Sequence, residues 1–128
     1  MRWFFTEKTK RAFFALWCVG WLVVAVKSLE PNIWLPLGLS DKAVHFSAYA
    51  VMAAAVGTFC HVPGRILGWV GLTVAISGLL EVGQHFVPSR TMDIFDLAAN
   101  ASGAVCGALL ALLWIGLVVR PLRPSLAQ

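Results

Sequence analysis

The sequence predicts an all-α membrane protein, a bundle of four transmembrane helices forming one domain over residues 1–128. The first observation behind this prediction is the composition, which is 59% hydrophobic and only 12% charged, with a mean hydropathy of +0.81. Soluble domains are about half apolar and about one-quarter charged. A chain of 128 residues cannot hide so much apolar surface from water, so lipid must solvate much of it.

The second observation is the length of four apolar runs, residues 12–29, 43–60, 66–87 and 97–119, each 18 to 23 residues long. As helices they would extend about 27 to 35 Å, which matches the hydrocarbon core of a bilayer. Backbone polar groups must be paired in lipid, so runs of this length are expected to be helical. The connections between them hold the helix breakers Pro31, Pro36, Pro63, Gly64 and Pro88.

The first run also has the basic flank of a signal peptide. It contains the bulky Trp17 and Trp21, however, and residues 25–28 at its end make a poor cleavage site. We therefore expect this run to remain as a membrane helix.

The distribution of basic residues predicts the orientation in the membrane. The amino tail, the second connection and the carboxyl tail share one side, which carries seven basic residues: Arg2, Lys8, Lys10, Arg11, Arg65, Arg120 and Arg123. The other side carries three, Lys27, Lys42 and Arg90. Both termini are therefore expected in the cytoplasm. Basic residues that flank membrane helices also explain the net charge of +4. Nucleic acid is therefore not an expected partner.

Each of the last three runs carries polar side chains along one helical face near its expected outer end. These faces comprise Asp41, His45 and Tyr49 in the second run, Ser77, Gly78, Glu81, Gln84 and His85 in the third, and Asp96, Asn100, Gly103 and Gly107 in the fourth. An ionised group that faces lipid costs about 2.5 to 3.5 kcal/mol, so polar faces should turn toward one another. The sequence therefore predicts a polar pocket open to the outside, braced by the first helix.

The ordered set of these residues resembles the VanZ-like family of small bacterial membrane proteins. The resemblance rests on Asp41-Lys42-x-x-His45-Phe46-x-x-Tyr49, Glu81-x-x-Gln84-x-Phe86-x-Pro88-x-Arg90 and Asp96-x-x-x-Asn100-x-x-Gly103-x-x-x-Gly107. It implies a four-helix protein of the bacterial cytoplasmic membrane, with the signature residues Asp41, His45, Glu81, Gln84, Arg90, Asp96 and Asn100. The family's namesake is associated with resistance to teicoplanin, a glycopeptide that attacks cell-wall synthesis. The resemblance thus implies a role in the cell envelope and does not bring an established reaction.

Three classes of function fit the predicted pocket. A binding module would hold the anionic head group of a membrane lipid or lipid-linked wall precursor, with the ligand-binding residues Asp41, Lys42, Gln84, Arg90, Asp96 and Asn100. An intramembrane enzyme would use Glu81 and His45 as acid and base on such a head group. A structural or assembly factor would use the same polar residues only to fix helix packing, as Gly103 and Gly107 are expected to do by admitting a neighbouring backbone.

None of these classes requires a cofactor, and the sequence contains no compact metal-binding motif. The alternative is a divalent metal held by Glu81 and His85, which lie four residues apart, with His45 or Asp96 completing the ligand set. A transporter is not expected, because the inner halves of the helices lack polar residues for a through-path.

Overall fold

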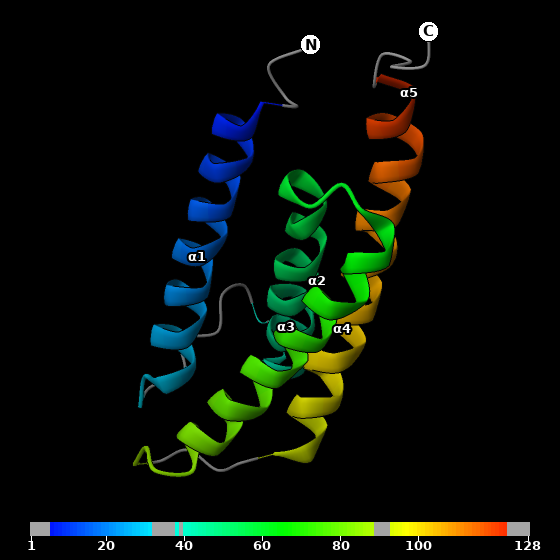
Figure 1. Ribbon diagram of the computed structural model, residues 1–128. Helices are drawn as coiled ribbons and strands as arrows, with labels where there is room; N and C mark the ends of the chain where they lie inside the picture. Colours follow the sequence, from blue (N-terminus) through cyan, green and yellow to red (C-terminus); the bar gives the residue numbers. More distant parts are fainter. Residues whose placement is uncertain (1–5, 32–37, 39, 89–92, 123–128) are drawn as a thin grey trace, which may run out of the picture.

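The computed structural model describes residues 6–31, 38, 40–88 and 93–122, and within them every regular element is a helix. Figure 1 shows α1 (Glu7–Leu29), α2 (Asp41–Phe59), α3 (Pro63–Gln84) and α4 (Ile94–Trp114) running alternately up and down. Beyond α4 the chain continues through a π-helical stretch, η3 (Ile115–Val119), into α5 (Arg120–Leu122). The predicted all-α bundle of four helices is confirmed.

Local capping sets where the helices begin. Thr6, Ser40 and Asp93 each accept a hydrogen bond from a backbone N–H in the first turn of α1, α2 and α4. α3 begins instead with Pro63, a position where the missing N–H has no helical partner to lose. Because Thr6 caps α1, this helix begins five residues before the apolar run at residues 12–29.

Three segments are long and apolar enough to cross a membrane: α1, α3 and the continuous stretch Ile94–Val119. α2 has 19 residues and falls outside this group, since its mean hydropathy is lowered by polar residues that include Asp41, Lys42 and His45. It contacts each of the other three helices. The outer surface carries large apolar side chains, and Leu67 and Leu117 are 78% and 73% exposed. Such a surface suits contact with lipid.

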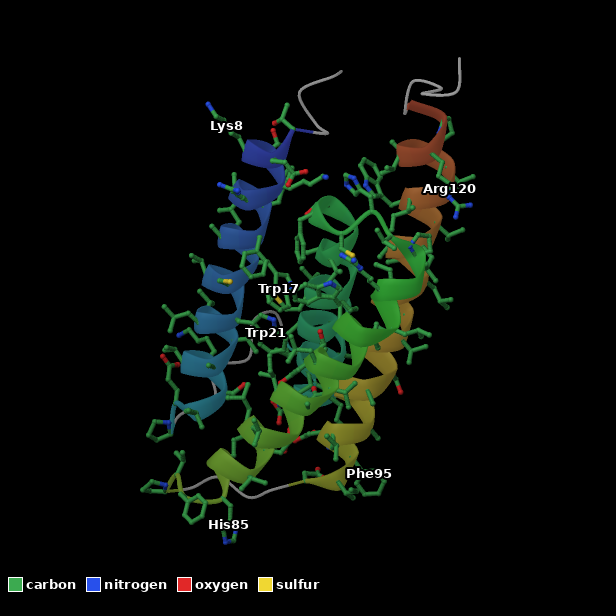
Figure 2. All side chains as sticks on the ribbon, in the orientation of Figure 1. Lys8, Trp17, Trp21, His85, Phe95 and Arg120 are labelled. Carbon is green, nitrogen blue, oxygen red and sulfur yellow. The ribbon has the colours of Figure 1, made fainter. Side chains whose placement is uncertain are left out.

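α1 is attached to the bundle through its aromatic side chains. Figure 2 shows Trp17 and Trp21 pointing from α1 toward the other helices, and both are buried. The indole N–H of Trp17 donates to the carbonyl of Met52 on α2 at 2.9 Å. The Trp17 ring also packs edge-to-face against Phe59 and Trp69, with centroids 5.8 and 5.3 Å away. These contacts give α1 the bracing position that the sequence predicts.

α2 and α4 approach so closely that only glycine fits between them. A Cβ at Gly103 would overlap the carbonyl oxygen of Phe46, and one at Gly107 would overlap the carbonyl oxygen of Ala50. Small residues allow this backbone contact in membrane helices. The close approach brings the polar first turns of α2 and α4 side by side.

Candidate functional site

Polar side chains from three helices meet at the lower end of the bundle in Figure 1, where α2 and α4 begin and α3 ends. We call this group the polar cluster, and its members are Asp41, Lys42, His45, Ser77, Glu81, Asp93, Asp96 and Asn100. Five of them, His45, Ser77, Glu81, Asp96 and Asn100, are only 0% to 9% exposed. Asp41, Lys42 and Asp93 are more exposed and form the mouth of the cluster.

Asn100 on α4 connects the three helices through its side-chain amide. Its NH₂ group donates to Ser77 Oγ at 2.8 Å and to Glu81 Oε1 at 3.2 Å, both on α3. Its carbonyl oxygen lies 2.9 Å from Nδ1 of His45 on α2. A side chain with this many partners in the interior holds the cluster in one arrangement.

The hydrogen bonds of Asn100 also set the tautomer of His45. Both N–H groups of the amide are used on α3, so the amide presents its oxygen, which only accepts, to the imidazole. His45 therefore donates from Nδ1–H, and in the neutral ring Nε2 carries the lone pair. Nε2 lies 3.8 Å from Asp41 Oδ1, which is too long for a hydrogen bond.

Glu81 is the most deeply placed carboxyl group of the cluster, at 3% exposure. Its Oε1 accepts from Asn100 and lies 3.9 Å from His45 Nδ1. Its Oε2 is buried and has no hydrogen-bond partner among the residues that the structure describes. Buried polar atoms are nearly always paired, so this oxygen is an acceptor held open in the interior.

Lys42 is neutralised by two carboxylates. Its Nζ lies 2.8 Å from Asp93 Oδ2 and 3.0 Å from Asp96 Oδ1. The hydrogen bond from Lys42 lowers the pKa of Asp93 below its ordinary value, with help from the backbone N–H of Phe95. Arg90, one of the ligand-binding residues predicted from the sequence, lies outside the described residues. Asp93 was not among the predicted ligand-binding residues, although its position three residues before Asp96 places both near the start of α4.

Asp41, His45 and Asp96 can each offer one ligand atom to a metal ion, and these atoms all lie within 4.8 Å of one another. The predicted alternative pair of Glu81 and His85 is not part of this group within the described residues. α3 ends at Gln84, and the His85 side chain is exposed, with its ring 5.5 Å from that of Phe86. Figure 2 shows His85 at the lowest point of the bundle, pointing away from the interior.

Gln84 lies apart from the rest of the predicted ligand-binding set. Its side chain is 2% exposed, and its NH₂ group donates to the carbonyl of Ser28 on α1 at 3.1 Å. It therefore joins the ends of α1 and α3. Asp41, Lys42, Asp96 and Asn100 do lie together in the polar cluster.

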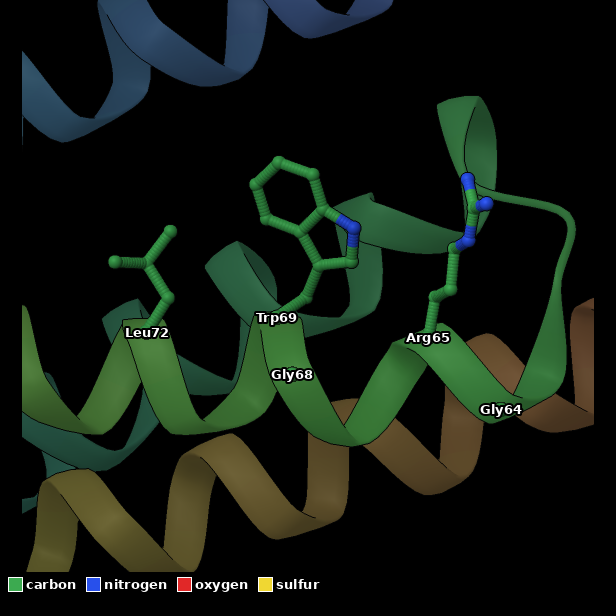
Figure 3. Close-up of a pocket in the computed structure, with 5 residues that line it drawn as sticks. All are labelled: Gly64, Arg65, Gly68, Trp69 and Leu72. Atoms are coloured by element: carbon green, nitrogen blue, oxygen red, sulfur yellow. The ribbon is translucent and has the colours of Figure 1, made fainter.

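A depression of about 370 Å³ lies near the start of α3, at the opposite end of this helix from Glu81. Figure 3 shows the residues that line it: Gly64, Arg65, Gly68, Trp69 and Leu72. None of them belongs to the predicted site. The chemistry of the polar cluster is thus separate from this depression.

Comparison with known protein families finds a match over most of the chain. The family described as VanZ/LLP1 matches residues 4–115, a range that includes α1 to α4 and the whole polar cluster. No curated protein and no solved structure shows a significant match to the chain.

Proposed function

Because the chain belongs to the VanZ/LLP1 family, we propose that its polar cluster binds the head group of a membrane lipid or a lipid-linked cell-wall precursor. The observation that carries this proposal is the buried Glu81 carboxylate, whose Oε2 has no partner among the described residues. A group that serves packing alone would be expected to find a partner within the fold. Intramembrane ionisable groups are functional by default.

The graded burial of the cluster supports a ligand that enters from the membrane surface. At the mouth, the side chains of Lys42, Asp93 and Asp41 are 49%, 35% and 32% exposed. One turn further in, His45 is 9% exposed, and Glu81 lies deeper still. A head group can therefore exchange its hydrogen bonds to water for hydrogen bonds to these side chains as it enters.

We further propose that the cluster faces outward from the bacterial cytoplasmic membrane, with both termini in the cytoplasm. Five basic residues lie at the opposite end of the bundle: Lys8, Lys10, Arg11, Arg65 and Arg120. Figure 2 shows Lys8 and Arg120 at that end. The positive-inside rule assigns the end that is richer in lysine and arginine to the cytoplasm.

The charges of the cluster indicate which part of a head group each residue contacts. The cluster holds four carboxylates, those of Asp41, Glu81, Asp93 and Asp96, and one lysine, Lys42, which pairs with Asp93 and Asp96. Such a set favours an amine or hydroxyl donor of the head group in the interior. The anionic part is left to Arg90, which lies outside the described residues, or to a bound cation. A protein that holds a wall-precursor head group at the outer surface would also alter the access of glycopeptides such as teicoplanin.

The test is the mass of lipid that co-purifies with the full chain in mild detergent. Glu81→Gln keeps the shape of the side chain and an acceptor for Asn100 but removes the charge, so we expect at least a tenfold loss of bound lipid. The matched control is Glu30→Gln, since Glu30 is a half-exposed acid paired with Lys27 at the same end of the bundle. Equal lipid occupancy in wild type and Glu81→Gln would refute the proposal.

A second candidate function is catalysis on the same head group. His45 lies between two carboxylates, with Nδ1 3.9 Å from Glu81 and Nε2 3.8 Å from Asp41. An imidazole oriented by acids is a common general base. Vesicles carrying a lipid-linked wall precursor distinguish the two functions. If the wild type alters the head group while Glu81→Gln only binds it, the protein is an enzyme. If both leave it intact, it is a binding module.

A further inference from the structure

We propose that Asp41, His45 and Asp96 form a binding site for a divalent transition-metal cation at the mouth of the polar cluster. The three ligand atoms come from two helices, and all lie within 4.8 Å of one another. Zn²⁺ binds nitrogen and oxygen ligands at about 2.0 to 2.2 Å, so two ligands of one ion lie at most about 4.3 Å apart. His45 Nε2 and Asp41 Oδ1, at 3.8 Å, already meet this limit. The Asp96 ligand atom lies within 4.8 Å of the other two, so it would have to move by at most about 0.5 Å to meet the same limit.

The orientation of His45 is that of a metal ligand. Metal-bound histidines usually donate their other ring N–H to an oxygen, which fixes the tautomer and aims the lone pair. Here Nδ1–H donates to Asn100 Oδ1, and Asn100 is itself held by Glu81. The Nε2 atom that carries the lone pair lies 3.8 Å from Asp41 Oδ1, and one ligand atom each of Asp41, His45 and Asp96 lies within 4.8 Å of the others.

The buried surroundings of His45 supply an independent reason for a cation. The imidazole is 9% exposed, and no hydrogen bond to Nε2 occurs within the described part of the chain. A lone pair this close to a carboxylate oxygen is electrostatically unfavourable unless a positive charge, a metal ion or a proton, lies between them. Glu81 Oε2 adds a further unpartnered negative atom close by. Lys42 alone does not balance these charges, because it already contacts Asp93 and Asp96.

The ligand set selects the class of metal. Imidazole suits Zn²⁺ and other transition metals, whereas Mg²⁺ and Ca²⁺ prefer oxygen alone. Three protein ligands also leave a coordination position open. That position suits a phosphate oxygen, which would let an acid-rich cluster hold an anionic head group. This role of the ion rests on the proposed head-group binding, whereas the presence of the ion does not.

Metal binding is tested on the full chain, purified in detergent and stripped with a chelator. Titration with each ion against a chromophoric chelator should give one Zn²⁺ per chain, weaker binding of Mn²⁺, and at least a hundredfold weaker binding of Mg²⁺ and Ca²⁺. His45→Gln, Asp41→Asn and Asp96→Asn should each weaken Zn²⁺ binding at least tenfold. The control His85→Gln, at an exposed histidine of the same end, should leave it unchanged.

Two results would overturn the metal site. One is Zn²⁺ affinity that is equal in wild type and Asp41→Asn, which would show that the Asp41 carboxylate is not a ligand of the ion. The other is equal affinity for Zn²⁺ and Mg²⁺, which would exclude the histidine as a ligand. Asp41 is the most exposed of the three ligands, so its variant keeps the test valid if His45→Gln fails to fold. If lipid co-purifies with the chain but Zn²⁺ does not bind, the metal site is refuted and the proposed head-group binding stands. If Zn²⁺ binds but no lipid co-purifies, the head-group binding is refuted and the metal site stands.

Discussion

Asn100 contacts more members of the polar cluster through hydrogen bonds than any other described residue. It is 1% exposed, donates to Ser77 and Glu81, and accepts from His45. In a medium of low polarity each of these groups would be costly to leave without a partner. The residue therefore determines both the stability of the cluster and the direction in which His45 presents its lone pair.

Replacing Asn100 with leucine should destabilise the protein strongly. The substitution leaves Glu81 and His45 buried with fewer partners, at a cost of about 1 to 3 kcal/mol for each unsatisfied group. Ser77→Ala removes only one acceptor, so we expect a smaller loss. Thermal unfolding followed by circular dichroism in detergent measures both variants. A loss for Asn100→Leu no greater than that for Ser77→Ala would contradict this role of Asn100.

Lys42 competes with the proposed metal ion for the carboxylate of Asp96. Lys42→Gln removes this competing charge, so we expect Zn²⁺ to bind several-fold more tightly, as measured by competition with a chelator. Lys27→Gln serves as the control, because Lys27 is an exposed lysine at the same end of the bundle. If Lys42→Gln binds Zn²⁺ more weakly than wild type while Lys27→Gln does not, the lysine stabilises the metal site and does not compete with the ion.

At the scale of the helices, the contact between α2 and α4 positions the site. Gly103 and Gly107 lie one and two turns beyond Asn100, directly against the backbone of α2. A wider spacing would move Asn100 and Asp96 away from His45 and Lys42. The distances between the side chains of the polar cluster therefore depend on the close packing of these two glycines.

Alanine at Gly103 or Gly107 should separate α2 from α4. Each Cβ would meet a backbone carbonyl of α2, which cannot give way as a side-chain tip can. We expect a loss of about 1 to 3 kcal/mol or more for each substitution, measured by thermal unfolding.

The matched controls are Gly71→Ala and Gly78→Ala on α3, where a Cβ would meet nothing within 4 Å. Alanine is a better helix former than glycine by about 1 kcal/mol, so these variants should be as stable as the wild type or more stable. Equal effects at all four positions would show that the contact between α2 and α4 does not require glycine.

The fold class and the meeting of three polar faces follow from the sequence because lipid imposes both. Apolar runs of this length must be helical, and the acids within them must turn inward. The finer pairings do not follow. Gln84 donates to the backbone carbonyl of Ser28, and the pattern of side chains in the sequence cannot predict a backbone partner. The separation of His85 from Glu81 depends on α3 ending at Gln84, and helix ends vary by one or two residues for reasons that spacing does not encode.

At the scale of the whole molecule, most of the described basic residues lie at one end and most of the described acids at the other, which is the basis of the proposed orientation. In a background with Cys18, Cys60 and Cys106 replaced by alanine, single cysteines at His85 and Gly64 report the two sides. Both positions are exposed. We expect an impermeant thiol reagent to label His85→Cys in intact cells and Gly64→Cys only after the membrane is opened. The reverse pattern would invert the topology.

Glu81 connects the stability of the fold with the proposed ligand. Its buried Oε2 has no partner among the described residues, and a buried charge left without a partner opposes folding, as is common for groups at functional sites. The most direct test measures melting temperature and bound lipid in the same preparations of wild type and Glu81→Gln. If Glu81 meets the lipid, the variant should lose its lipid while melting a few degrees higher than delipidated wild type. A variant that melts lower than delipidated wild type and still holds its lipid would show that Glu81 serves the fold and not the ligand.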